Sequence, residues 1–200
     1  MRRILAIAGL LGGLFWIVLG FFPPEGGPPG TAEYNDEVLL NRLWTPALFG
    51  MLLGVIGLFL SMRPLIARTA KGGFIAMLLG FALMISGNFA EYWILFEFPH
   101  QGSDGWIRGI AWMTLLSGTL LMLIASAVTG LAMSRTARAP KWLSLVFLLP
   151  LPLTIAIGLM KMSWAGMPIG ILSVIVGSIG LLPDNARLTP GSETKEESSS

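Results

Sequence analysis

The chain has 200 residues, of which 54% are hydrophobic and only 12% are charged, and its mean hydropathy is +0.75. An average soluble domain carries roughly 25% charged residues, which help to cover its surface with side chains that water solvates well. This composition excludes a cytosolic enzyme, a nucleic-acid-binding protein and a disordered chain. It predicts an all-α, polytopic membrane protein whose principal partner is the lipid bilayer.

The residues that most often carry cofactors or covalent chemistry are scarce. The sequence contains no cysteine and one histidine, which excludes disulfides, thiolate nucleophiles and His-rich metal sites within one chain. It also lacks the GxxxxGK[ST], HExxH and GxSxG motifs of phosphate-binding loops, zinc proteases and hydrolases. We therefore expect no metal, no cofactor and no catalytic residue. The sequence favours a protein that is not an enzyme, without deciding the question.

Six apolar segments are long enough to cross a bilayer as helices, for which about 20 residues are needed. Backbone polar groups must pair within the segment when they lie in lipid, so these runs are predicted to be helical. A six-helix transmembrane domain is expected over residues 1–183, with spans at 4–22, 46–62, 73–96, 106–133, 142–162 and 168–182. The sixth span is the shortest and can also be a tilted or partly re-entrant helix.

The first apolar run follows two arginines, as in a secretory signal peptide. It is longer than the hydrophobic region of such a peptide, and no A-x-A-like cleavage site follows it. We expect it to be a retained span.

The distribution of basic residues predicts the orientation, because cytoplasmic loops are enriched in Lys and Arg. Ten of the 13 basic residues fall on one side of the predicted spans, namely Arg2, Arg3, Arg63, Arg68, Lys71, Arg135, Arg138, Lys141, Arg187 and Lys195. With an even number of spans, both termini are expected in the cytoplasm (N-in/C-in), and the membrane is expected to be the plasma (inner) membrane of a prokaryote.

Two segments lie outside the spans. Residues 23–45 are predicted to be an external, Pro/Gly-rich loop, whose second half, EYNDEVLLNRLW, can form a short helix lying on the membrane interface. Residues 184–200 are polar and low in complexity, which predicts a disordered cytoplasmic tail.

Small residues recur on one face of four spans, a pattern that lets membrane helices approach closely. The faces are Gly9 and Gly13; Gly50, Gly54, Gly57 and Ser61; Ala76, Gly80 and Gly87; and Gly170, Ser173, Gly177 and Gly180. They predict either a compact bundle or a seam with a second copy of the chain or a partner membrane subunit.

The small face of the third span continues to Glu91, with Asn88 on nearly the same side. Glu91 lies roughly 27 Å along the helix from Gly73, which places it near the outer interface and facing the bundle interior. An inward-facing carboxylate in a membrane is a candidate functional group. Lys161 is expected at a similar depth, so a Glu91–Lys161 ion pair is one hypothesis, and Arg108 is the rival partner.

The candidate binding residues are those around this carboxylate: Asn88, Glu91, Tyr92, Trp93, His100, Arg108 and Lys161. The alternative interpretation is structural, because Trp and Tyr form aromatic belts at membrane interfaces and long basic side chains reach toward water. His100 in particular is expected to be an ordinary loop residue.

Three functional hypotheses follow. The first is a structural or accessory membrane protein, or one that binds a hydrophobic ligand between its helices. The second is a small transporter or channel with an externally open vestibule near Glu91. The third is a membrane enzyme that acts on a lipid or quinone-like substrate, with Glu91 as its acid or base, which requires convergent polar groups beside an enclosed pocket.

Overall fold

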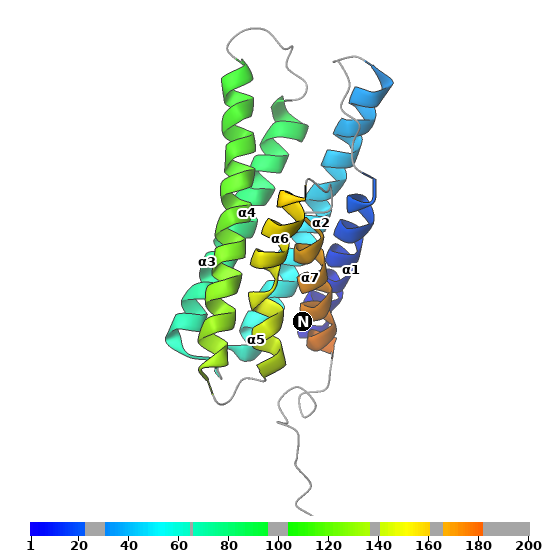
Figure 1. The fold of residues 1–200 in the computed structure, drawn as a ribbon. Coiled ribbons are helices and arrows are strands. Elements are labelled where there is room, and N and C mark those ends of the chain that lie inside the picture. Colours follow the sequence, from blue (N-terminus) through cyan, green and yellow to red (C-terminus); the bar gives the residue numbers. More distant parts are fainter. Residues whose placement is uncertain (23–30, 65, 96–103, 137–140, 161–165, 182–200) are drawn as a thin grey trace, which may run out of the picture.

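The computed structural model describes residues 1–22, 31–64, 66–95, 104–136, 141–160 and 166–181. Every regular element in these ranges is a helix, which confirms the predicted all-α class (Figure 1). The elements are α1 (Arg2–Gly20), α2 (Ala32–Met62), α3 (Arg68–Phe89), the π-helix η1 (Ala90–Ile94), α4 (Asp104–Ser134), α5 (Lys141–Leu148), α6 (Pro150–Leu159) and α7 (Met167–Leu181).

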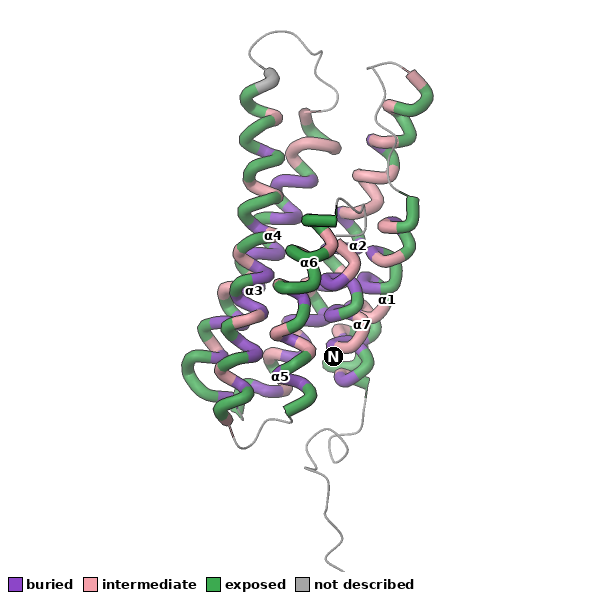
Figure 2. The backbone as a smooth tube through the Cα atoms, viewed as in Figure 1, coloured by how far each residue is buried: buried purple, intermediate pink, exposed green. Residues whose placement is uncertain are grey.

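Within the described residues, five helical segments are long and apolar enough to cross a membrane: α1, α2, α3 with η1, α4, and α5 with α6. The sixth apolar helix, α7, has 15 residues and is shorter than a full span. Exposed residues lie along the outside of the bundle (Figure 2). Many of them are large and apolar, for example Ile75, Leu79 and Ile124. Such an exterior suits lipid rather than water.

The membrane-spanning segments alternate in direction, with α5 and α6 counted as one segment, so that the start of α1 and the end of α7 lie at the same end of the bundle (Figure 1). The opposite end is formed by the N-terminal parts of α2 and α4 together with η1, and we call it the η1 end. The basic residues Arg68, Arg135 and Lys141 lie at helix ends away from it.

Helix α2 differs from the expected loop with a separate interfacial helix. It begins at Ala32, after the N-cap Thr31, and continues without a break through Pro46 to Met62. Proline removes one backbone N–H from a helix and usually bends or ends it. Here side chains of the preceding turn, Arg42 and Thr45, bond to η1 and α3 and hold the two halves of α2 in one helix.

The fifth predicted span is divided into α5 and α6, because Pro150 and Pro152 cannot donate backbone hydrogen bonds to the preceding turn. Ser126 of α4 donates a hydrogen bond of 2.7 Å to the carbonyl oxygen of Phe147, beside this break. The contact attaches α5 to α4, whereas α6 contacts α4 much less extensively.

The small-residue faces form the seams between helices of the same chain. Between α1 and α2, a methyl group added to Gly54 would lie 2.5 Å from the Cα of Gly9, a distance that no real contact allows. Equally close approaches join α1 to α7 at Gly177, and α3 to α4 at Gly80 and Gly118. The predicted glycine faces are therefore occupied inside the bundle.

Large apolar side chains fill the centre of the bundle. Met51, Phe74, Met77, Phe81 and Met122 are all at most 1% exposed. They come from α2, α3 and α4, and they lie on the side of Leu48, Met84 and Thr119 that is away from the η1 end. This packed layer is the floor of the cavity described next.

Candidate functional site

At the η1 end, the third membrane helix widens from an α-helix into a π-helix. The backbone N–H of Leu95 bonds to the carbonyl oxygen of Ala90, five residues earlier. Single π-helical turns within α-helices are rare and are frequent at functional sites. The wide turn carries Glu91, Tyr92 and Trp93, three of the candidate residues.

Two arginines satisfy backbone carbonyls at this helix end. Arg42 of α2 donates from Nε to the oxygen of Tyr92 at 2.8 Å, and Arg108 of α4 donates from Nη2 to the oxygen of Leu95 at 2.8 Å. Positive charge is favourable at a helix C-terminus, where carbonyl groups lack partners within the helix. The two guanidinium groups therefore stabilise the end of η1 from both sides.

A short hydrogen-bond chain links α2, α3 and η1 inside the bundle. Thr45 donates its hydroxyl hydrogen to Oδ1 of Asn88 at 2.5 Å, and Trp93 donates from Nε1 to the Thr45 oxygen at 3.1 Å. Thr45 and Asn88 are buried, with 5% and 2% of their surface exposed. The Arg42 guanidinium carbon also lies 5.3 Å from the centre of the Trp93 ring, a cation–π distance.

A cavity of about 290 Å³ lies beside this chain. Its described lining comes from α1, α2, α3, η1, α4, α6, α7 and Gly166, and it combines aromatic rings with uncharged polar groups. The lining residues are Trp16, Asn41, Trp44, Leu48, Met84, Asn88, Tyr92, Trp112, Leu115, Thr119, Thr154, Gly166 and Ile169. This composition resembles the small-molecule sites of other proteins, which are mostly apolar with a few placed polar groups.

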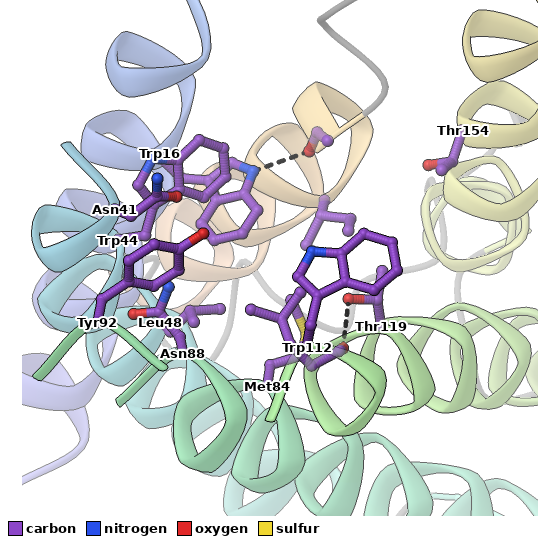
Figure 3. Close-up of a pocket in the computed structure, with 13 residues that line it drawn as sticks. Trp16, Asn41, Trp44, Leu48, Met84, Asn88, Tyr92, Trp112, Thr119 and Thr154 are labelled. Atoms are coloured by element: carbon purple, nitrogen blue, oxygen red, sulfur yellow. Dashed lines mark hydrogen bonds between the residues drawn. The ribbon is translucent and has the colours of Figure 1, made fainter. Parts of the chain in front are cut away.

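The lining is arranged on facing walls (Figure 3). Trp16, Trp44 and Tyr92 gather on one side, and Trp112 of α4 faces them from the other. The first wall is fixed, because Trp16 and Trp44 pack edge to face with ring centres 4.1 Å apart. Trp16 also donates from Nε1 to the carbonyl oxygen of Gly166 at 2.9 Å.

Of the candidate residues predicted from the sequence, Asn88 and Tyr92 line the cavity, and Trp93 bonds to Thr45 next to it. Arg108 binds the Leu95 carbonyl. Glu91 is half-buried and does not belong to the described cavity lining.

The Glu91 carboxylate is under-satisfied, because its Oε2 atom is buried and has no hydrogen-bond partner in the described part of the chain. Arg108 and Glu37 both act on it electrostatically. His100 and Lys161 lie outside the described residues, and so does the expected Glu91–Lys161 ion pair.

Sequence reasoning missed several polar residues of the site. Asn41 and Thr45 fall in the segment expected to be a loop, and Thr154 lies in a span with no glycine face to mark its inner side. A signal was present in the spacing of Asn41, Thr45 and Leu48, which lie three or four residues apart and therefore share one helix face.

Comparison of the chain with protein-family models, with curated proteins and with solved structures found no match.

Proposed function

We propose that this protein binds a hydrophobic small molecule in the cavity at the η1 end of its helix bundle. The observation that carries the proposal is the cavity itself, about 290 Å³ of space walled by three tryptophans and a tyrosine. Membrane helices that serve only as packing partners can close such space with side chains. An open, aromatic-lined volume is instead what a ligand with a flat, apolar body requires.

Binding is favoured over conduction by the packed layer beneath the cavity. Met51, Met77 and Phe81 are at most 1% exposed and lie on their helices beyond the cavity-lining residues, on the side away from the η1 end. A transporter or channel needs a water-accessible route toward the other membrane surface. A layer of tightly packed methionine and phenylalanine side chains opposes such a route.

Binding is also favoured over an enzymatic reaction in which Glu91 would act as the acid or base. An enzyme that uses this carboxylate needs it at the pocket wall, within hydrogen-bond reach of the substrate. The polar groups of the described wall are instead amides, hydroxyls and indoles, and Glu91 is not among the lining residues.

The orientation is part of the proposal. Basic side chains such as Arg68 and Arg135 lie at the end away from η1, and a bundle with this asymmetry would place that end in the cytoplasm. Both termini would then be cytoplasmic, and the cavity would lie in the outer half of a prokaryotic plasma membrane.

The proposal is tested by photolabelling with 3-(trifluoromethyl)-3-phenyldiazirine, a neutral, compact, apolar ring compound, on purified protein in lipid nanodiscs. Leu48 and Met84 line the cavity and are 1% exposed, so they react only with a molecule inside it. We expect peptide mapping to find label on both. Label restricted to lipid-facing residues such as Leu79, which is 57% exposed, would overturn the proposal.

A further inference from the structure

We infer that the cavity selects a neutral lipid whose head group is a ring bearing carbonyl oxygens, the chemical class to which quinones belong. The inference rests on the proposed function and deepens it, because it names the ligand class for the same cavity. Four features of the described lining support it: the aromatic walls, a hydroxyl group without a described partner, an amide NH₂ group and an opening toward lipid.

The walls favour a flat ring. Tyr92 and Trp44 lie on one side of the cavity and Trp112 on the other (Figure 3). Aromatic surfaces bind other rings by offset stacking or edge-to-face packing, and they bind flexible acyl chains with less geometric preference. A ring bound here would therefore meet aromatic lining residues of α2, η1 and α4.

Thr154 provides a hydroxyl that its own helix does not use. Other helical threonines of this chain donate to the carbonyl four residues earlier, namely Thr114, Thr119, Thr129 and Thr136. The Oγ1 atom of Thr154 is buried and has no partner in the described structure, although its residue lines the cavity. A buried hydroxyl without a partner is unfavourable, so a ligand oxygen that accepts its hydrogen bond gains stability.

Asn88 provides a donor from another helix. Its Oδ1 atom already accepts the hydroxyl hydrogen of Thr45, so the group that it offers to the cavity is the amide NH₂. Thr154 on α6 and Asn88 on α3 therefore present donors from separate walls. Two donors are matched by a ring that carries acceptor oxygens at separate positions.

The described lining contains no charged side chain, which favours a neutral ligand. The guanidinium groups of Arg42 and Arg108, on two helices that line the cavity, donate to the carbonyl oxygens of Tyr92 and Leu95. A carboxylate or ammonium ligand would enter this lining without a described partner of opposite charge, which is costly in a low-dielectric interior.

The cavity reaches the surface on the side where α6 separates from α4. Trp112 lines the cavity and is nevertheless 48% exposed. On the other side of this gap, Thr154 lies on α6, whose neighbours Leu153 and Ile155 are exposed. Since these surroundings are apolar, the gap opens toward lipid, and an alkyl tail can extend through it.

The test is a competition against the photolabelling of Met84 by the phenyldiazirine reagent in nanodiscs. Three competitors share a decyl tail: decyl-benzoquinone, decylbenzene, which lacks the oxygens, and 4-decylbenzoate, which carries a charge. We expect decyl-benzoquinone to compete at the lowest concentration. In Thr154→Val its apparent affinity should fall roughly three- to tenfold, the effect of one neutral hydrogen bond. Thr154→Ser and the control Thr114→Val should keep the native value.

The outcomes separate the two proposals. If decylbenzene competes as well as the quinone, or if the benzoate competes best, the ligand class is wrong while binding in the cavity stands. If Met84 is labelled but no competitor reduces the label, the ligand class is again wrong. If Met84 is never labelled, the proposed function itself fails. The preference for the quinone is measured on the native chain, so the test holds even if Thr154→Val does not fold.

Discussion

Thr45 of α2 and Asn88 of α3 join their helices through a hydrogen bond of 2.5 Å between two buried side chains. Thr45 directly precedes Pro46 in α2. This hydrogen bond fixes the position of Asn88 at the cavity and engages its Oδ1 atom, so that the NH₂ group is the part of the amide that it offers to a ligand. Structure and proposed binding thus depend on the same pair of residues.

Replacement of Thr45 by valine should destabilise the bundle. The change leaves Oδ1 of Asn88 and Nε1 of Trp93 without their described partner, and an unsatisfied buried polar group costs about 1–3 kcal/mol. The midpoint of thermal unfolding in detergent should fall. Thr114→Val is the matched control, since Thr114 bonds only to its own helix, and it should leave the midpoint nearly unchanged. Equal unfolding midpoints for the two variants would mean that the Thr45 hydroxyl group does not stabilise the bundle.

Replacement of Gly54 by alanine should also destabilise the protein, through the seam between α1 and α2. The added methyl group would approach the backbone of Gly9, and such overpacking typically costs about 1–3 kcal/mol. Gly158→Ala adds the same methyl group where nothing lies within 4 Å. We expect a lower unfolding midpoint for the first variant only, and a similar loss in both would mean that the seam is not closely packed.

Arg108→Gln should loosen the end of η1 without unfolding the bundle. The guanidinium group that binds the Leu95 carbonyl is removed, and a cation at a helix C-terminus contributes about 0.3–1 kcal/mol. Hydrogen exchange should accelerate by about two- to fivefold at the amide of Leu95, which bonds to Ala90. Arg135→Gln, at the other end of α4, serves as the comparison and should not change exchange at Leu95.

Glu91→Gln should leave binding in the cavity nearly unaltered. Glu91 is not part of the described lining, and its buried Oε2 atom has no described hydrogen bond to lose. Photolabelling of Met84 should stay within about twofold of the native yield, a range of about 0.4 kcal/mol in binding. Abolished labelling in a variant that still folds would instead place the carboxylate in the binding site.

The proposed orientation can be tested with single cysteines, because the native chain contains none. Ala32 at the η1 end and Ser134 at the other end are both exposed. With a membrane-impermeant maleimide on intact cells, we expect Ala32→Cys to react at once and Ser134→Cys only after permeabilisation. The reverse pattern would invert the topology.

The fold was largely predictable because hydropathy and small residues act locally. Apolar length predicts helices, and the face that carries Gly80 and Gly87 does pack against α4. The continuity of α2 was not predictable, since Pro46 and the polar residues before it favour a break. That helix is held by contacts of Arg42 and Thr45 with residues more than 40 positions away.

The candidate site was predictable only in part, for a related reason. The glycine face of the third membrane helix predicted an inward direction for Asn88, which lines the cavity, and for Glu91, which is not part of the described lining. Tyr92 was a candidate only as a neighbour of Glu91. The cavity itself depends on how distant segments meet: Trp16 packs on Trp44 and bonds to Gly166, and α6, which begins at Pro150, contacts α4 much less than α5 does. No local pattern in the sequence predicts these contacts between distant segments.

The most direct measurement of the central claim is the yield of phenyldiazirine label at Met84 in the native protein and in Thr119→Phe. A phenylalanine at position 119, on the cavity wall, should occupy the space that the reagent needs. We expect the label at Met84 to be lost and the label at the lipid-facing Leu79 to be unchanged. The control variant Thr114→Phe should be labelled to the same extent as the native chain. Undiminished labelling of Met84 in Thr119→Phe would contradict binding in this cavity.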